Sequence, residues 1–460
     1  MRDMNIKEFG AVGDGITLDT LAIQDAIDAA AELWKEENPV EQTGAKKIAA
    51  KETGNLADQV KVIIPKGTYL TGSIFLQSNM ELHFEDGAEL IGSTNEADHP
   101  KIHTRVAGIE MDWIAALLNI YEKENVTVTG KGILNGQGQH WWNKYWGEDE
   151  KSGLRKDYDA KGLRWVVDYD CYRPINFLVY SSKNILIKEI TSRMSGFWNL
   201  HICYSEHVHV DGICISENYG PSTDGIDIDS SRHILVENCE TFCNDDSICL
   251  KAGRDGDGLE VNRVCEDIEI RNCNILKGCG VTIGSENSGG IKDVYIHDLT
   301  YHNTDCGFRI KSARTRGGFI RNIRVEHLSM TNVQYPFSWV LNWHPLYSYC
   351  EIPKDYEGEI PEHWHTLTKP VPEGKGLTQI ENILIQHVDA RITEDRKVSS
   401  RAFEIQGYPE KPMRNISFED ISIEADEFGR ISAVENMQWN KVTLHMKNEN
   451  NPDNDVYDNR

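Results

Sequence analysis

The chain has 460 residues, and its 73 Asp and Glu residues exceed its 48 Lys and Arg residues, which gives a net charge of -25. This excess argues against nonspecific binding to nucleic acid or to an anionic membrane, and the lack of an apolar run of about 18 residues argues against a membrane span. The chain also starts without the charged-then-apolar pattern of a signal peptide. We therefore expect a cytoplasmic protein, or a periplasmic or secreted one if a signal has been removed, of undetermined oligomeric state.

The 11 cysteines are an odd number, and none forms a pair at CxxC spacing. This pattern disfavours both a zinc site and a full disulfide framework, so we expect mostly buried, reduced thiols. We expect no metal and no cofactor.

Residues 19–34, DTLAIQDAIDAAAELW, place apolar side chains at helical spacing. These side chains are Leu21, Ile23, Ile27, Ala30, Ala31 and Trp34. We expect an amphipathic helix, with Asp19 or Thr20 as its N-cap, that covers the exposed edge of a repeat fold. The polar stretch 36–59 is interpreted as a surface insertion, so that an N-terminal cap spans about 1–60.

A short pattern of alternating apolar and polar residues recurs along the rest of the chain. It reads NILIKEI at Asn184, HVHVDGI at His207, HILVENC at His233, DIEIRNC at Asp267, DVYIHDL at Asp293, NIRVEHL at Asn322, NILIQHV at Asn382 and NISFEDI at Asn415. Most steps are roughly 23 to 34 residues, a period typical of solenoids. The pattern predicts an all-β fold, a single-stranded right-handed parallel β-helix that forms one domain over residues 1–460. Two segments rich in aromatic residues, about 137–171 and 335–380, break the rhythm and are candidate walls of a cleft.

Five aspartates crowd into residues 222–253, STDGIDIDSSRHILVENCETFCNDDSICLKAG. Four coils can be aligned on the apolar pairs Ile226/Ile228, Ile248/Leu250, Val281/Ile283 and Phe308/Ile310. Two residues before each pair stand Asp224, Asp246, Cys279 and Cys306. Because neighbouring strands lie about 4.8 Å apart, we expect Asp224 and Asp246 side by side, with Asp245 next to them and aimed differently.

The alternation predicts that Asp227 and Asp229 point outward with them, so that these carboxyl groups need not be buried. Arg309 and Lys311 fall on the same outer face two coils later, about 10 to 15 Å away by strand spacing. Acids beside cations on a rigid face suit the cleavage of an acidic sugar. Any one of these aspartates alone is more often structural, since Asp is common in the turns of such coils.

The blocks STDG, NDDS, GCG and RIK, in this order, resemble the four signature blocks of glycoside hydrolase family 28, the polygalacturonases and related pectin hydrolases. The resemblance covers nearly the whole chain, since FGAVGDG, PKGTYLTGSIFLQSN, GAELIGS, GKGILNGQGQHWW, SGFWNLH and VTIGSENSGG also look like family segments. It implies that Asp245 is the general acid, and that Asp224 and Asp246 position and deprotonate the attacking water. Arg309 and Lys311 would bind the substrate carboxylate, and the anomeric centre would be inverted.

Two positions depart from the family pattern. Ser222 stands where the family block usually has Asn, and Cys279 stands where its Gly-His-Gly block has His. The second departure suggests a shift in substrate, with Cys279 as a candidate contact. The long aromatic segments look like those of exo-acting members, which close one end of the groove.

Further candidate groups for substrate binding come from the surrounding segments. They are Trp198, His201, Lys251, Arg254 and Arg314, with Arg316 as a further cation and Trp141, Trp146 and Trp339 as possible stacking platforms. Each of these tryptophans is equally well explained by packing within its own loop.

We therefore expect an inverting, exo-acting hydrolase of α-1,4-linked galacturonic acid in pectin oligosaccharides. A rhamnogalacturonan hydrolase is the alternative within the same class, and a non-catalytic carbohydrate-binding β-helix is the alternative outside enzymes. A calcium-dependent lyase is disfavoured, because no cluster resembles the calcium site of such lyases.

Overall fold

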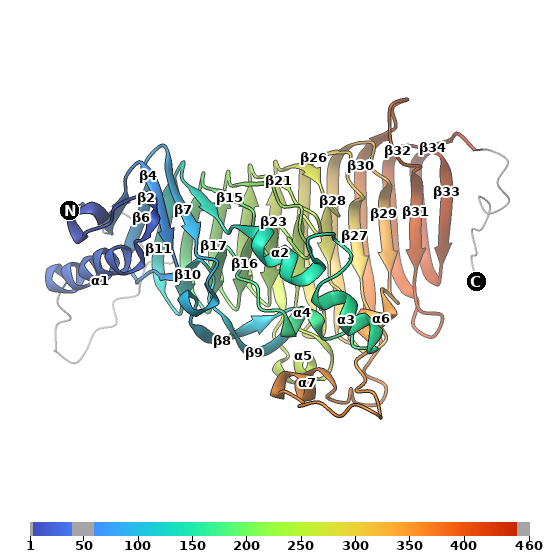
Figure 1. The fold of residues 1–460 in the computed structure, drawn as a ribbon. Helices are drawn as coiled ribbons and strands as arrows, with labels where there is room; N and C mark the ends of the chain where they lie inside the picture. The colour runs from blue at the N-terminus through green and yellow to red at the C-terminus, as the bar shows by residue number, and fades with distance from the viewer. Residues whose placement is uncertain (1–2, 39–58, 449–460) are drawn as a thin grey trace, which may run out of the picture.

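The computed structural model describes residues 3–38 and 59–448, in which parallel strands are wound into a long coil (Figure 1). One sheet of eleven strands runs along the coil. Its strands are β5 (Ile74–Phe75), β10 (Leu118–Tyr121), β13 (Phe177–Tyr180), β16 (Leu200–Cys203), β19 (Ile226–Asp229), β22 (Ile248–Lys251), β25 (Val281–Ile283), β27 (Cys306–Lys311), β29 (Tyr335–Val340), β31 (Arg401–Gln406) and β33 (Glu427–Ser432). We call it the site sheet.

A second sheet of 21 strands contains the eight repeats found in the sequence. The repeats form β14 (Lys183–Lys188), β17 (Glu206–Asp211), β20 (Arg232–Glu237), β23 (Cys265–Arg271), β26 (Ile291–His302), β28 (Phe319–Thr331), β30 (Gln379–Arg391) and β32 (Met413–Ala425). The other strands are β1 (Met4–Asn5), β2 (Asp14–Leu18), β3 (Val60–Ile64), β4 (Gly67–Thr71), β6 (Met80–Phe84), β7 (Ala88–Gly92), β11 (Glu124–Gly130), β12 (Ile133–Asn135), β15 (Thr191–Arg193), β18 (Cys214–Ser216), β21 (Glu240–Phe242), β24 (Asn274–Lys277) and β34 (Val434–Met446).

The register of the repeats is the one predicted from the sequence. Ile185, the first apolar residue of its repeat, pairs with Val208 of the next, and the same pairing continues coil by coil to Ile416. These side chains join one apolar core that extends from Ile6 to Val434. The fold is therefore a right-handed parallel β-helix, as expected.

The residue that opens each repeat adopts a left-handed backbone conformation. Asn184, for example, has a φ of 56°, and the opening residues of the other seven repeats have φ values between 55° and 60°. Asn and Asp accept this conformation more readily than most other side chains. The polar residue at this position therefore sets the bend of each coil.

Helix α1 (Thr20–Glu37) lies at the N-terminal end of the coil (Figure 1). Its buried residues are Ile23, Ala26, Ile27 and Ala30, which join the core. Leu21 was predicted to lie on the apolar face, but it is 78% exposed. Asp19 is the N-cap residue, as expected, but its side chain makes no capping hydrogen bond to the helix. The Asp19 carboxylate instead accepts hydrogen bonds from the backbone N–H groups of Val12 and Gly13. Most of the expected insertion at 36–59 lies outside the described residues.

Three insertions project from the site sheet. The first is a hairpin that the sequence analysis missed, formed by β8 (Lys101–Val106) and β9 (Ile109–Ile114). The second carries α2 (Gly138–Trp146), α3 (Leu154–Ala160) and α4 (Val167–Asp170). The third carries α6 (Pro345–Ser348) and α7 (Glu362–Leu367). It starts later than the predicted residue 335, because residues 335–340 form β29.

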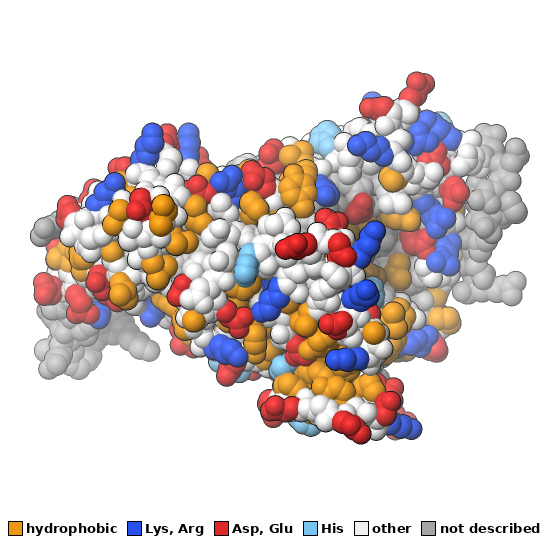
Figure 2. Space-filling view, in the orientation of Figure 1, with side chains coloured by type: hydrophobic (Ala, Val, Ile, Leu, Met, Phe, Trp, Pro, Cys, Tyr) orange, Lys and Arg blue, Asp and Glu red, His pale blue; other side chains and the backbone are white. Residues whose placement is uncertain are grey.

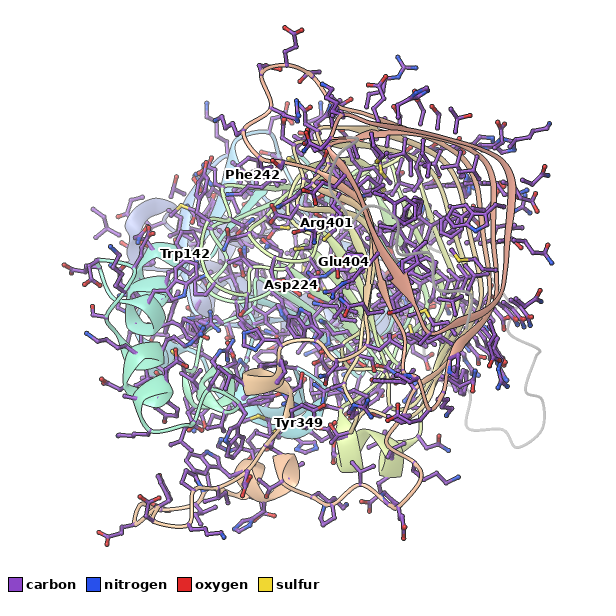
Figure 3. The ribbon with its side chains drawn as sticks, turned by 90° about the vertical axis from the view of Figure 1, so that its right-hand side faces the viewer. Trp142, Asp224, Phe242, Tyr349, Arg401 and Glu404 are labelled. Carbon is purple, nitrogen blue, oxygen red and sulfur yellow. The ribbon has the colours of Figure 1, made fainter. Side chains whose placement is uncertain are left out.

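Seen from the end of the coil, the insertions lie on one side of the stacked strands, and Asp224 lies between the strands and these insertions (Figure 3). Helix α5 (Asp255–Val261) lies on the same side, close to α7 and β9. All 11 cysteines are free and eight are buried, as the sequence predicted. In the described part of the chain, no helix is long and apolar enough to cross a membrane.

Candidate active site

The predicted alignment of the site sheet is confirmed. Ile226 pairs with Ile248, Ile248 with Val281, and Val281 with Phe308. The residues just before these strands are therefore stacked as well, since the Gly225 N–H donates to the carbonyl of Asp246 at 2.9 Å. The turns that carry the aspartates thus lie on adjacent coils.

Four of the five aspartates of these turns and strands are buried, contrary to the expectation that they need not be. Asp224 is 4% exposed, and Asp227, Asp229 and Asp246 are fully buried. The alternation correctly predicted that they point away from the apolar interior. It gave no information about the three insertions that cover this face.

Asp246 is surrounded by positive charge. The Lys311 Nζ atom lies 2.6 Å from its carboxylate, Arg309 donates to it at 3.3 Å, and the Thr282 hydroxyl donates at 2.7 Å. The expected gap of 10 to 15 Å is thus wrong for the charged groups, because these long side chains reach back across two strands. Burial by itself would raise the pKa of Asp246, but Lys311 and Arg309 outweigh it and hold the pKa far below its usual value. Asp246 is therefore ionised.

Asp245 has the opposite electrostatic setting. It is partly buried, and its side chain lines the pocket described below. Burial and the negative charge of Asp246 together raise its pKa. Adjacent carboxyl groups with pKa values pushed apart are the arrangement from which a proton donor and a base can be made.

Asp224 also has a raised pKa, because it is buried and lies close to Asp227 and Asp245. Its nearest cation, the Lys251 Nζ atom, is 3.7 Å away. Of the three aspartates predicted to be catalytic, only Asp246 is therefore held in the ionised form. The negative charge that activates water is centred on Asp246, with Asp224 beside it as a hydrogen-bonding partner.

Lys251 connects this cluster to two carboxyl groups that were not predicted as site residues. Its Nζ atom lies 3.4 Å from Asp227 and 3.5 Å from Glu286. Burial raises the pKa of Asp227 to about 8 despite Lys251. Burial would also raise the pKa of Glu286, but Lys251 and Arg316 lower it to about 2. The block VTIGSENSGG contains Glu286, but the alternation gives no reason to place that residue near Lys251.

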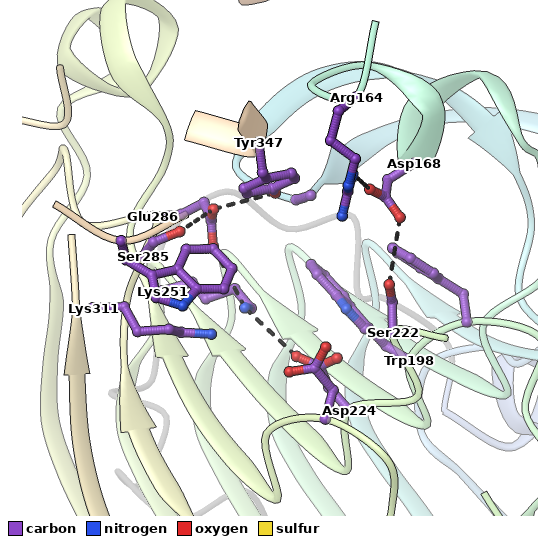
Figure 4. A pocket seen from close by; sticks show the side chains of 14 residues that line it. Arg164, Asp168, Trp198, Ser222, Asp224, Lys251, Ser285, Glu286, Lys311 and Tyr347 are labelled. Atoms are coloured by element: carbon purple, nitrogen blue, oxygen red, sulfur yellow. Dashed lines mark hydrogen bonds and ion pairs between the residues drawn. The ribbon is translucent and has the colours of Figure 1, made fainter. Parts of the chain in front are cut away.

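An open pocket with about 490 Å³ of empty space lies over these groups (Figure 4). It is lined by Ala107, Arg164, Asp168, Phe197, Trp198, Ser222, Asp224, Asp245, Lys251, Ser285, Glu286, Lys311, Trp343 and Tyr347. All three insertions contribute to this lining, which supports the prediction that the two longer ones form its walls. In Figure 2 the surface is hollowed beside α2 and α3, with Lys and Arg side chains at the edge.

Two tryptophans of the pocket lie against lysines. The Lys251 Nζ atom is 5.0 Å from the centre of the Trp198 ring, and the Lys311 Nζ atom is 4.5 Å from that of Trp343. Trp198 was predicted and Trp343 was missed. Of the two interpretations left open for Trp339, packing is correct, because it is fully buried among Phe308, Phe337 and Phe418. Trp141 is likewise 1% exposed within its own insertion.

Five of the predicted binding residues do not line the pocket, namely Arg309, Cys279, His201, Arg254 and Arg314. Arg309 and Cys279 lie next to Asp246. His201 is fully buried beneath Trp198, with its ring 4.8 Å away, and lies 3.8 Å from Asp229. Arg254 is buried and ties two insertions together by donating to the Tyr169 hydroxyl and the Tyr347 carbonyl. Arg314 pairs with Glu410 on the surface. The alternation could not show the covering loops, which separate His201 and Arg254 from solvent.

Cys279 is partly buried next to the acids. Its sulfur and the nearest carboxylate oxygens of Asp245 and Asp246 lie within 4.8 Å of one another. Asp224, Asp246 and Cys249 form a second such group. Lys311 and Arg309 already contact Asp246, so a metal ion in either place would meet strong repulsion.

Comparisons with known proteins identify the family. The family model described as glycosyl hydrolases family 28 matches residues 57–344. The chain therefore belongs to glycosyl hydrolase family 28 and is a glycoside hydrolase.

Individual relatives extend the match along the chain. The sequence is 26% identical over 428 residues to a probable polygalacturonase of Vitis vinifera, covering 91% of this chain and 74% of the relative. It is 27% identical over 362 residues to an exo-poly-alpha-D-galacturonosidase of Dickeya chrysanthemi, covering 72% of this chain and 55% of the relative.

Solved structures show the same fold. An exopolygalacturonase from Thermotoga maritima matches with a TM-score of 0.72 at 24% identity, over 96% of this chain and 92% of that one. A family 28 exopolygalacturonase from Yersinia enterocolitica matches with a TM-score of 0.74 at 22% identity, over 96% of this chain and 75% of that one.

Proposed function

We propose that this protein is an exo-acting polygalacturonase that removes α-1,4-linked galacturonic acid from the non-reducing end of pectin oligosaccharides. The observation that carries this proposal is the pocket itself, where Asp224, Asp245 and Glu286 face Lys251 and Lys311 under a roof of insertions. Lys311 and Arg309 also contact the buried Asp246. The cations suit the carboxylate of a galacturonate unit. The names of the Dickeya, Thermotoga and Yersinia relatives are consistent with this substrate and this mode of action.

Contacts between the insertions support exo action. Asp170, at the end of α4, accepts hydrogen bonds from the Trp364 indole at 3.1 Å and pairs with His363 at 2.5 Å. Arg254 adds its bonds to Tyr169 and to the carbonyl of Tyr347. The second and third insertions are thereby joined, and we propose that this junction closes one end of the groove so that it accepts a chain end.

In the proposed mechanism, Asp245 protonates the glycosidic oxygen, and Asp246 with Asp224 takes a proton from the attacking water. The raised pKa of Asp245 and the lowered pKa of Asp246 suit these two roles. Inversion is proposed from the family resemblance rather than from spacing. Asp246 lies within 4.8 Å of Asp245 and within 4.8 Å of Asp224, closer than the roughly 6.5–9.5 Å typical of inverting pairs.

The test is to follow a galacturonate trimer and a rhamnogalacturonan oligosaccharide by proton NMR. We expect galacturonate monomer from the trimer, appearing first as the β-anomer and without unsaturated products. A first product with the α-anomer would contradict inversion, and unsaturated product would indicate a lyase. Cleavage of the rhamnose-containing chain alone would favour the second candidate, which rests on Cys279 in place of the family histidine.

Asp245→Asn is the matched variant for this assay. We expect kcat to fall by about 10²–10⁴-fold, because the amide cannot donate the proton that the leaving oxygen needs. Affinity for the trimer should change little, as measured by calorimetry. A variant that keeps the turnover of the parent enzyme would overturn the assignment of Asp245.

A further inference from the structure

Cys279 and Cys306 are neighbours on adjacent coils of the site sheet, at the same position before their strands. The strand after Cys279 pairs in register with the strand of Cys306, Val281 against Phe308. The residues just before the two cysteines are also joined, because the Asp305 N–H donates to the Gly278 carbonyl at 3.0 Å. This register places the two thiol-bearing residues directly side by side.

The two backbones approach each other closely at this point. A Cβ atom built on Gly280 would come within 2.4 Å of the Cys306 carbonyl oxygen and within 2.1 Å of the Gly307 carbonyl oxygen. Cys279 and Cys306 also lie close enough for each thiol to shift the pKa of the other. Strands about 4.8 Å apart fall inside the Cα separation of 4.4–6.8 Å that disulfides span. The spacing of the coils therefore allows a link between the two cysteines.

The surroundings make one of the two thiols reactive. The neighbouring Cys279 thiol and the nearby charge of Arg309 lower the pKa of the Cys306 thiol, although its burial acts in the opposite direction. Cys306 is 5% exposed, and Cys279 is partly buried beside Asp245 and Asp246. A thiol with a lowered pKa beside a second thiol is the arrangement typical of redox-sensitive cysteines.

We propose that Cys279 and Cys306 form a redox-sensitive pair whose oxidation by a peroxide links the two coils and switches off the neighbouring acids. The Cys306 thiolate attacks one oxygen of hydrogen peroxide, the O–O bond breaks, and hydroxide leaves, so that Cys306 becomes a sulfenic acid. The Cys279 sulfur then attacks the Cys306 sulfur and loses its proton, and the oxygen leaves as water. Two thiols are oxidised to one disulfide, and one peroxide is reduced to two waters.

A disulfide between Cys279 and Cys306 would displace catalytic groups that contact the two cysteines or their neighbours. The Cys279 N–H donates to the Asp245 carbonyl at 2.9 Å, so a shift of Cys279 moves the backbone of the predicted general acid. The Cys306 thiolate lies beside Arg309, and Arg309 contacts Asp246. Displacements of about 1 Å in such groups can cost 10²-fold in rate. This consequence rests on the proposed function, whereas the link itself does not.

The chain contains a matched internal control. Cys239 and Cys273 are stacked on adjacent coils in the same way, and the Asn274 N–H donates to the Cys239 carbonyl at 2.8 Å. Both are buried, at 1% and 2% exposure. They lie away from the acids, and the neighbouring Cys273 thiol together with burial raises the pKa of Cys239 well above its usual value. This pair has the geometry for a disulfide without the reactivity.

The test is to treat the reduced protein with hydrogen peroxide, block remaining thiols, and identify linked peptides by mass spectrometry without reduction. We expect a Cys279–Cys306 link, no Cys239–Cys273 link, and at least a roughly tenfold loss of activity on the galacturonate trimer that dithiothreitol reverses. In Cys306→Ser the link cannot form, so peroxide should cause no loss of activity that dithiothreitol reverses. The Cys273→Ser variant should respond like the parent protein.

Absence of the Cys279–Cys306 link, or a preference for Cys239–Cys273, would overturn the proposal. A Cys279–Cys306 link that leaves activity unchanged would overturn the proposal that oxidation of this pair regulates the enzyme. If the reduced protein cleaves neither test substrate, the proposed function fails, and the linked peptides still decide whether the pair is redox-active.

Discussion

Asp227 and Asp229 show how two aspartates of one strand can acquire opposite electrostatic roles. Both are fully buried on β19 and point toward the insertions. Asp229 contacts Arg105 at 3.1 Å, and although burial opposes it, this cation lowers the pKa of Asp229. Asp227 has only the shared Lys251 as its cation, so burial prevails and its pKa rises to about 8. The sequence alternation treats the two as equivalent.

This difference predicts opposite effects on stability. Between about pH 4 and pH 8, folded Asp227 keeps a proton that the unfolded chain releases, so its contribution to the free energy of unfolding falls as pH rises. Asp227→Asn removes that dependence. We expect the free energy of unfolding of the variant, relative to that of the parent, to rise by at least about 1 kcal/mol as the pH is raised from 5 to 8. Urea unfolding measures this difference.

Asp229→Asn is the control for this comparison. Its parent carboxylate has a lowered pKa, so its stabilising effect is present at neutral pH and is lost only in acid. The variant should therefore be less stable than the parent protein at pH 7. Equal behaviour of the two variants would contradict the assigned pKa directions.

At the scale of the coil, the polar residue that opens each repeat has two functions. It accepts the left-handed conformation, and in several coils its amide also bonds to the next coil. Asn415 has a φ of 56°, donates to Asn382 at 2.9 Å, and accepts from Asn436 at 2.7 Å. These exposed contacts form a ladder along the outside of the bends.

We expect Asn415→Ala to lower the free energy of unfolding by about 1–2 kcal/mol, because alanine is strained in this conformation. Asn415→Gly loses the same amide bonds but accepts the backbone angle without strain. It should cost less than the alanine variant in the same urea titration. If glycine proved the more damaging of the two, the ladder bonds rather than the backbone angle would dominate.

At the scale of the whole molecule, the pocket exists because segments far apart in sequence meet over the site sheet. Asp170 and Trp364 are 194 residues apart, and their contact joins the second and third insertions. The aromatic pair Trp165 and Trp364, with ring centres 5.4 Å apart, supports the same junction. Under the proposed function, the mode of attack on a polymer depends on these insertions rather than on the coil.

Asp170→Ala should weaken this junction, because it leaves the buried Trp364 indole N–H and His363 without their carboxylate partner. We expect a raised KM for the galacturonate trimer and, with longer oligomers, products larger than the monomer. Chromatography of the products measures this directly. Asp157→Ala, on the exposed face of α3, is the control and should release monomer as the parent does. Unchanged products in Asp170→Ala would show that the junction does not set the mode of action.

The sequence by itself determined the coil and the position of its acids. Alternation with a period of two fixes which side chains point inward, and the turn residues fix where each coil bends, so register could be counted from Ile226 to Phe308. These are local properties of short segments. The same counting placed Asp224 and Asp246 on adjacent coils and Cys279 next to Cys306.

Only the tertiary structure decided how those residues are buried and charged. The covering insertions carry no repeat, so their contacts with the site sheet could not be counted, and the buried state of the aspartates was missed. Side-chain conformation also decides which charged groups meet across the strands. Lys311 and Arg309 extend across two strands to Asp246, and Lys251 lies near Asp224, Asp227 and Glu286 at once. The resemblance assigned the roles of proton donor and base, but pKa values follow burial and charge at distances of a few ångströms, so only the folded chain shows why Asp245 and Asp246 differ in pKa.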